Sequence, residues 1–217
     1  VKSNVASKLD TPKLHEDTII RLEMDEVGKV LDLAENGQDM TKMQQGFHKH
    51  TQARDYALLS LFLGTGIRIS ECVGLNIDDF DFKQNAFKVT RKGGNKVILY
   101  FNDEVSDALQ NYILERKKIK TQPGHEKALF LSLQNRRITV RAVENLVKKY
   151  SKIVNPLKKI TPHKLRSTFG TNLYRETNDI YVVADVLGHK DVNTTRKHYA
   201  AISDDIRRNA AQKVRFK

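Results

Sequence analysis

The chain has 217 residues, 39% of them hydrophobic, which is enough to form one large domain with a substantial buried core. Lysine and arginine number 38 against 26 aspartate and glutamate, so the formal net charge is +12. A chain this basic makes nucleic acid the first partner to consider, although many basic proteins bind no nucleic acid specifically.

Several classes are excluded. No apolar run approaches the roughly 20 residues of a membrane span, and no signal peptide is visible. The single cysteine, Cys72, excludes an internal disulfide and a multi-cysteine metal site, which suits a reducing cytoplasm. Because the sequence begins at Val1 rather than methionine, we expect further residues upstream.

The amino-terminal part is predicted to contain one helix between polar segments. Residues 1–17 are polar and are interpreted as a linker or arm, whereas residues 19–33 have the apolar period of an amphipathic helix. Residues 35–49 are polar and predict a loop with a helical turn. His48 and His50 in this loop lack the third and fourth ligands that a zinc site needs.

Residues 53–63 are strongly apolar and predict a buried helix, which Gly64 to Gly66 interrupts before a second helix over residues 67–75. Arg68 follows the break at once, in an apolar neighbourhood where a charged group needs a partner. It either forms an ion pair with Glu71, or points into a cleft to bind a phosphate while Glu71 steadies it. The local sequence leaves both interpretations open.

Residues 80–100 change to a period of two and predict a three-stranded antiparallel meander whose second turn, residues 91–96, is basic and rich in glycine. Such a tip is usually solvated, but it can also carry a lysine into a cleft. Helices are predicted over residues 103–118 and 139–153, with a loop and a short strand over 128–132 between them. The predicted fold class is mainly α with a small three-stranded antiparallel sheet (α+β).

The stretch from residue 161 to residue 199 contains a cluster of chemically capable residues. Thr161 followed by Pro162 indicates a helix start. His163 and Arg166 are three residues apart and therefore share one face of that helix. Gly188 ends a second apolar run, as a glycine after a helix should.

His189 follows that glycine directly, and Tyr199 comes ten residues later, past a Thr-Thr pair able to cap a short helix. Two histidines, an arginine and a tyrosine from consecutive short helices are the parts of a phosphoryl-transfer site. The sequence contains neither a P-loop nor the carboxylate cluster of a two-metal nuclease.

Three stretches in order, GTGIRISECVGL, TPHKLRSTFGTNL and LGHKDVNTTRKHY, resemble the signatures of the tyrosine recombinases, the phage-type integrase and Xer-like family. The resemblance covers about residues 53–201. It implies a set of catalytic residues at matching positions: Arg68, Lys92, His163, Arg166, His189 and Tyr199. Glu71 would support Arg68, and Arg91 and Lys96 would contact DNA. The arginine that many relatives carry just beyond the hairpin tip is absent, which leaves Lys92 and Lys96 as candidates; we assign Lys92 from its place at the end of the first strand.

The resemblance implies the chemistry as well. Tyr199 would attack a DNA phosphodiester and form a 3'-phosphotyrosyl intermediate, with His163 as the base, His189 as a hydrogen-bond donor and Lys92 as the acid. Arg68 and Arg166 would bind the non-bridging oxygens. We expect a metal-independent DNA integration and recombination enzyme without a cofactor.

For the domains, the resemblance implies a catalytic domain over residues 18–217, whose carboxy-terminal helix and tail (about 203–217) exchange between neighbouring copies. The amino-terminal DNA-clamping domain of the family is not expected within this chain. The partners would be double-stranded DNA and, on DNA, a synaptic tetramer of a chain that is monomeric without it. The resemblance also implies a cytoplasmic protein of bacterial or phage origin that belongs to a mobile element.

Two other functions remain open. One is a DNA-binding module that has kept the fold without activity, against which the presence of all six catalytic-type residues argues. The other is a type IB topoisomerase, which shares the chemistry but relaxes DNA instead of exchanging strands. The sequence does not distinguish integration, excision, dimer resolution and inversion, and does not name the DNA site.

Overall fold

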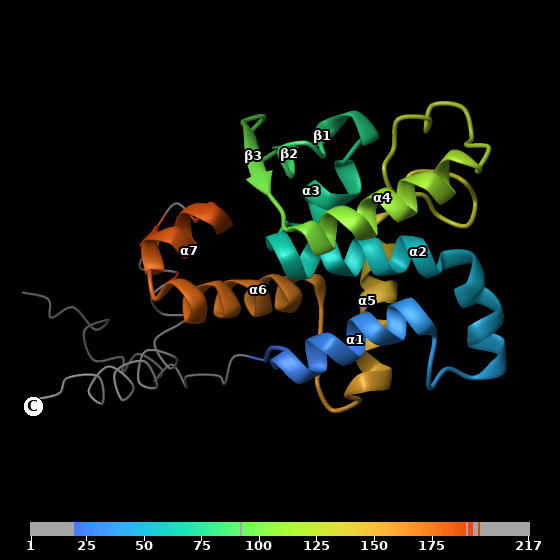
Figure 1. The fold of residues 1–217 in the computed structure, drawn as a ribbon, viewed down its shortest axis with the longest axis horizontal. Helices are drawn as coiled ribbons and strands as arrows, with labels where there is room; N and C mark the ends of the chain where they lie inside the picture. The colour runs from blue at the N-terminus through green and yellow to red at the C-terminus, as the bar shows by residue number, and fades with distance from the viewer. Residues whose placement is uncertain (1–19, 92, 190, 193–194, 196–217) are drawn as a thin grey trace, which may run out of the picture.

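The structure, a computed structural model, describes residues 20–91, 93–189, 191–192 and 195. Within these residues it contains seven α-helices and one three-stranded antiparallel sheet (Figure 1), which confirms the predicted fold class. The helices are α1 (Met24–Asn36), α2 (Lys42–Thr65), α3 (Ile69–Gly74), α4 (Asp103–Lys117), α5 (Val140–Val154), α6 (Pro162–Thr177) and α7 (Ile180–Leu187). The strands are β1 (Phe80–Asp81), β2 (Ala86–Thr90) and β3 (Lys96–Tyr100), and a short 3-10 helix, η2 (Ile77–Asp79), precedes β1.

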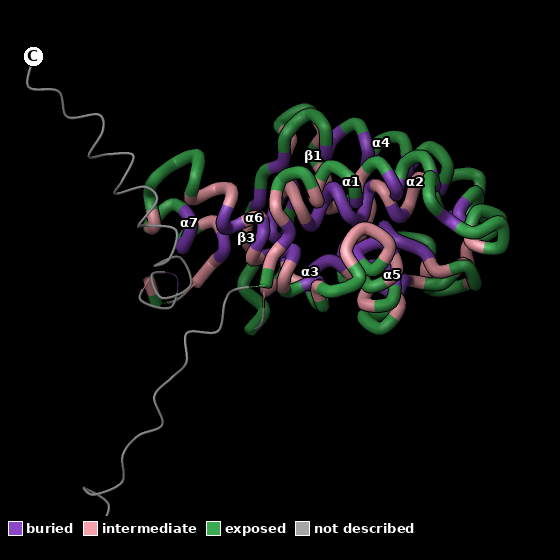
Figure 2. The backbone as a smooth tube through the Cα atoms, turned by 90° about the horizontal axis from the view of Figure 1, so that it is seen from below, coloured by how far each residue is buried: buried purple, intermediate pink, exposed green. Residues whose placement is uncertain are grey.

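Helix α2 lies at the centre of the molecule, with α1, α4 and α6 packed along it (Figure 1). The sheet stands at one end, near α3, and α7 packs on α6. Buried residues line the inward faces of these elements (Figure 2). None of the helices in the described part of the chain is long and apolar enough to cross a membrane.

Helix α2 begins earlier than predicted. The polar composition of residues 35–49 predicts a loop with a helical turn, but the helix starts at Lys42. The Gln44 backbone amide donates to the Thr41 hydroxyl at 3.3 Å, and the Gln44 side chain accepts from the Thr41 amide at 2.9 Å. This reciprocal pair caps the helix, and the polar residues that follow are mostly exposed, so no apolar period marks the segment.

The predicted strand over residues 128–132 is also wrong. Only two isolated bridges occur there, Asn76 with Ala128 and Leu131 with Arg137. The apolar run is buried because it packs under α4, where the Tyr112 ring stacks on Phe130 with a centroid distance of 5.3 Å. Burial against a helix therefore explains the apolar run without a strand.

Beneath the sheet, four phenylalanines form one aromatic cluster, in which Phe80 and Phe87 stack at 4.9 Å and Phe87 and Phe101 lie at 5.9 Å. A separate small cluster holds α7 on α6, where Val183 and Leu187 are buried against partly buried residues that include Phe169. Among the described residues, this cluster is the apolar contact that positions α7 on α6.

A buried polar network connects α2 to α5. Asp55, 2% exposed, accepts hydrogen bonds from the Tyr150 hydroxyl at 2.8 Å and the Thr51 hydroxyl at 3.0 Å. His48 is buried, with its Nδ1 3.1 Å from the Tyr150 hydroxyl, and desolvation with the nearby Lys149 charge lowers its pKa. Among the described residues no three histidine, cysteine or carboxylate side chains gather to form a metal site.

Replacing Tyr150 with phenylalanine is expected to lower the free energy of unfolding by about 1 to 3 kcal/mol, because it removes a buried partner of Asp55. Urea denaturation measures this change. The control is Tyr100→Phe, which removes a hydroxyl from a side chain that is 68% exposed and should change stability by less than about 0.5 kcal/mol. Equal effects of the two substitutions would contradict a stabilising role for the network.

Candidate active site

The site is built around the turn that ends α7. Gly188 has a φ of +60°, the left-handed conformation that glycine adopts without strain. Its amide donates to the Asp185 carbonyl at 2.8 Å and the His189 amide to the Ala184 carbonyl at 2.9 Å. These bonds end the helix as the sequence predicted, and they leave the carbonyls of Leu187 and Gly188 without helical donors.

Two arginines supply those donors. Arg68 donates through Nη2 to the Leu187 carbonyl at 3.3 Å and to the Gly188 carbonyl at 3.1 Å. Arg166 donates through Nη2 to the same Leu187 carbonyl. Because a helix carboxy-terminus carries partial negative charge, it stabilises cations placed there. The structure thus brings together the arginines of two sequence motifs that lie far apart in the chain.

Glu71 fixes the direction of Arg68. Its Oε1 is 2.9 Å from Nη1 of Arg68, and its Oε2 accepts the Arg68 backbone amide at 3.1 Å, which caps the start of α3. The Glu71 side chain is 4% exposed and that of Arg68 is 36% exposed. The ion pair considered from the sequence is therefore present, and it leaves part of the guanidinium open to solvent.

Arg166 is more deeply placed, at 7% exposed, and joins two helix ends. Its Nη1 donates to the carbonyl of Gly66, the residue that ends α2, while its Nη2 binds the end of α7. At Gly66 a Cβ would overlap the Phe169 ring and lie 3.0 Å from Leu187, so the helices approach closely. A guanidinium has five N–H donors, so it can hold both carbonyls and still contact an anion.

The two histidines lie in different settings. His163 is exposed in the first turn of α6, on the helix that also carries Arg166. His189 is half-buried, and its Nδ1 lies 2.7 Å from the hydroxyl of the fully buried Thr195. This contact orients the imidazole ring. The sequence suggested only a helix-capping role for Thr195, and nothing in the local pattern indicates its contact with His189.

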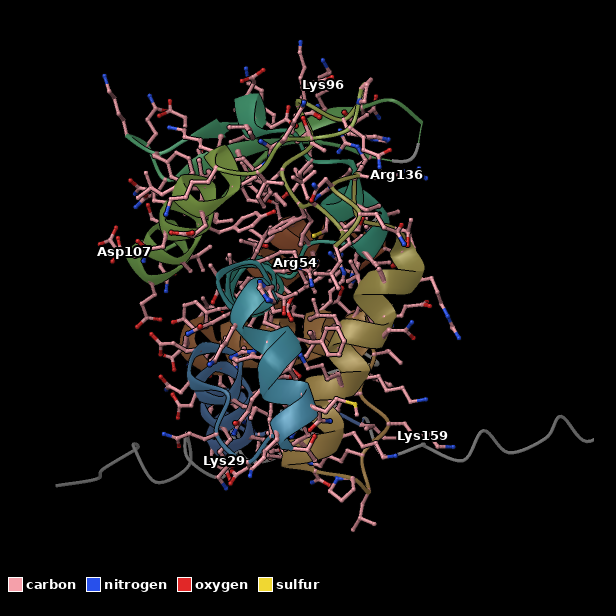
Figure 3. The ribbon with its side chains drawn as sticks, turned by 90° about the vertical axis from the view of Figure 1, so that its right-hand side faces the viewer. Lys29, Arg54, Lys96, Asp107, Arg136 and Lys159 are labelled. Carbon is pink, nitrogen blue, oxygen red and sulfur yellow. The ribbon has the colours of Figure 1, made fainter. Side chains whose placement is uncertain are left out.

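The hairpin that follows β2 faces the same turn. Arg91 is half-buried and packs against Gly188, whereas Lys96 is exposed at the start of β3, at the sheet end of the molecule (Figure 3). Lys92 and Tyr199 lie outside the described residues, as do His198 and the segments 1–17 and 203–217. Of the six predicted catalytic residues, the structure therefore describes the two arginines and the two histidines, together with the supporting Glu71.

The one cysteine adjoins this site but is not part of its chemistry. Cys72 follows Glu71 on α3 and is 1% exposed. Burial, reinforced by the Glu71 charge, raises the pKa of its thiol, so the thiolate that a nucleophile requires is disfavoured.

The chain belongs to the phage integrase family, whose model matches residues 21–205. It is 35% identical over 215 residues to a tyrosine recombinase XerC of Caldanaerobacter subterraneus subsp. tengcongensis, covering 98% of this chain and 56% of that protein. The chain spans about half the length of the curated relatives it matches first.

Solved structures agree with this family assignment. A crystal structure of XerA recombinase superposes with a TM-score of 0.74 at 27% identity, over 91% of this chain and 66% of that one. A XerH site-specific recombinase bound to palindromic difH substrate, a post-cleavage complex, superposes with a TM-score of 0.71 at 21% identity, over 89% of this chain and 53% of that one. The second likeness shows the fold alone.

Proposed function

We propose that this chain is the catalytic domain of a site-specific DNA recombinase, which cleaves and rejoins DNA strands through a covalent phosphotyrosyl intermediate. The observation that carries the proposal is the meeting of Arg68 and Arg166 at the Leu187 carbonyl. Two guanidiniums held side by side can bind the non-bridging oxygens of one phosphodiester and stabilise the charge that develops during transfer. Family membership supports the same function.

In the proposed reaction, the Tyr199 hydroxyl oxygen attacks phosphorus and its proton passes to His163. The bond from phosphorus to the 5' oxygen breaks, and the electron pair leaves with that oxygen. The oxygen takes a proton from the hairpin lysine, Lys92, and becomes a 5'-hydroxyl. Attack by this hydroxyl, or by that of a partner strand, reverses the sequence and releases Tyr199.

Each group in this scheme answers a chemical need. A tyrosine has a reference pKa of about 10 and needs a base or a stabilised anion to react. An alkoxide is a poor leaving group and needs an acid. His189, oriented by Thr195, would add a hydrogen bond to the phosphate. Protein groups supply every proton transfer, so the scheme requires no metal ion or cofactor.

The proposed partner is double-stranded DNA, with Arg91 and Lys96 at the hairpin contacting its backbone. Lys96 is exposed and projects at the sheet end of the molecule (Figure 3). Membership of the phage integrase family supports DNA as the partner class. We further propose residues 1–17 as an arm and 18–217 as the catalytic domain. The chain would be a monomer without DNA. On DNA it would assemble into a synaptic tetramer through residues 203–217. Its location would be the cytoplasm.

The proposal is tested with a nicked duplex that carries the sequence the chain selects from a random DNA pool. Cleavage lets the short 5' fragment diffuse away and traps the intermediate. A covalent protein–DNA band is expected with EDTA present. Binding without any covalent band would favour a DNA-binding module, and relaxation of supercoiled plasmid without joint products would favour a topoisomerase.

Replacing Lys92 with alanine is expected to slow strand cleavage by about 10² to 10⁴-fold, the usual contribution of a general acid, with DNA binding nearly unchanged. A substrate with sulfur in place of the bridging 5' oxygen should restore the rate, because a thiolate leaves without a proton. Lys96→Ala is the matched control and should affect binding more than cleavage. Loss and sulfur rescue at Lys96 instead would reverse the assignment.

A further inference from the structure

Arg91 forms the base of the hairpin tip. Its backbone amide donates to the Asn95 carbonyl at 2.8 Å, and its carbonyl accepts the Gly94 amide at 3.0 Å. These two bonds close the turn between β2 and β3. The position of Arg91 therefore bears on the whole tip, because in the sequence Lys92 lies within this turn and Lys96 follows it directly.

The Arg91 side chain reaches from the hairpin to the turn at Gly188. A Cβ built on Gly188 would overlap the Arg91 guanidinium, so glycine is required at 188 for this contact as well as for its positive φ. Nε of Arg91 is buried and has no hydrogen-bond partner among the described residues. The guanidinium is thus held by packing on the glycine backbone, a contact that we call the Gly188 seat.

The Gly188 seat places a third guanidinium on the turn that Arg68 and Arg166 already hold. Arg68 binds the carbonyl of Gly188 itself. The Glu71 carboxylate pairs with Arg68. The buried Nε of Arg91, which has no partner among the described residues, carries a desolvation cost. Such a cost is typical of functional sites.

We propose that Arg91 is a positioning residue, which seats the β2–β3 hairpin on the Gly188 turn and so presents the general-acid lysine to the phosphate bound by Arg68 and Arg166. The inference rests on the proposed function. It goes beyond contact of Arg91 with DNA, since it assigns Arg91 a contact within the protein. It holds whether Lys92 or Lys96 is the acid, because the Gly188 seat fixes the turn that contains Lys92 and directly precedes Lys96.

The test compares cleavage of the oxygen substrate and the 5'-bridging sulfur substrate, each at saturating protein and in a single turnover. Arg91→Ala should slow cleavage of the oxygen substrate by about 10- to 100-fold, the effect of a misplaced catalytic group. The sulfur substrate, which needs no acid, should be cleaved within about threefold of the wild-type rate. Equal loss on both substrates would overturn the proposal, because at saturating protein a contact with the scissile phosphate itself, unlike a contact with the flanking backbone, would slow both.

Arg91→Lys distinguishes the effect of the packing contact on Gly188 from the effect of the positive charge at position 91. It keeps the positive charge but loses the planar guanidinium that packs on Gly188, so it should bind DNA like the wild type and still show the excess loss on the oxygen substrate. Full activity in Arg91→Lys would mean that the charge alone matters, and it would overturn the role proposed for the Gly188 seat. This variant also replaces Arg91→Ala if the alanine protein fails to fold.

A second measurement does not depend on cleavage. Gly188→Ala should lower the melting temperature through backbone strain and by displacing the Arg91 guanidinium from its contact, whereas in an Arg91→Ala background only the strain remains. The drop in melting temperature should therefore be smaller in that background. Identical drops in melting temperature in the two backgrounds would refute the contact between Arg91 and Gly188. A wild-type chain that cleaves no DNA would refute the proposed function, while this stability cycle would still decide on the contact.

Discussion

Arg166→Lys is expected to slow single-turnover DNA cleavage by about 10² to 10³-fold, the cost of removing one preorganised donor from a transition-state site. Arg166 bonds the carbonyl of Gly66 with one nitrogen and that of Leu187 with another. An ammonium is a single point charge and cannot span both carbonyls while contacting a phosphate. The variant keeps the charge, so DNA binding measured by titration should change little.

Arg116→Lys is the matched control for this variant. Arg116 is also a buried arginine, 5% exposed, and it also bonds backbone carbonyls: Nε lies 2.8 Å from that of Ala128 and Nη2 lies 2.6 Å from that of Glu126. It stands on α4, away from the α7 turn. Both variants should lose stability by thermal melting, but only Arg166→Lys should lose cleavage. A similar loss of cleavage in both would assign Arg166 to the fold alone.

The sequence predicts a helix wherever an apolar period or a clear start or end residue marks it. Thr161 with Pro162 marks the start of α6, and Gly188 marks the end of α7, as the structure confirms. The first turns of α2 were missed because they are polar and exposed. The capping pair of Thr41 and Gln44 is the available signal, and it lies in a stretch whose polar composition predicts a loop.

The candidate site was predictable in its parts but not in its arrangement. The spacing of Arg68 and Glu71 predicts their contact, because a glutamate at the third position of a helix reaches back to the residue that precedes the helix. No local pattern reveals that Arg68 and Arg166 share one carbonyl, since that depends on how α2, α6 and α7 pack. The same holds for Thr195 on His189 and for Arg91 on Gly188, both of which are tertiary contacts.

Tyr199 is expected to carry the covalent bond to DNA. It closes the ordered series of Arg68, His163, Arg166 and His189 in the sequence, and its hydroxyl is the best nucleophile near His189 along the chain. Thr195, the nearest alternative hydroxyl that the structure describes, is fully buried and engaged with His189. Peptide mapping of the adduct trapped on the nicked duplex should therefore find the DNA on Tyr199.

Tyr199→Phe removes only the attacking oxygen, so the covalent band should vanish while DNA affinity stays at the wild-type value. His198→Ala, one residue earlier, is the control and should keep the band. Chelation of divalent ions with EDTA should leave the wild-type band intact, because His163 and the hairpin lysine carry the protons. An adduct on any residue other than Tyr199, or a band that disappears with EDTA, would refute this chemistry for the chain.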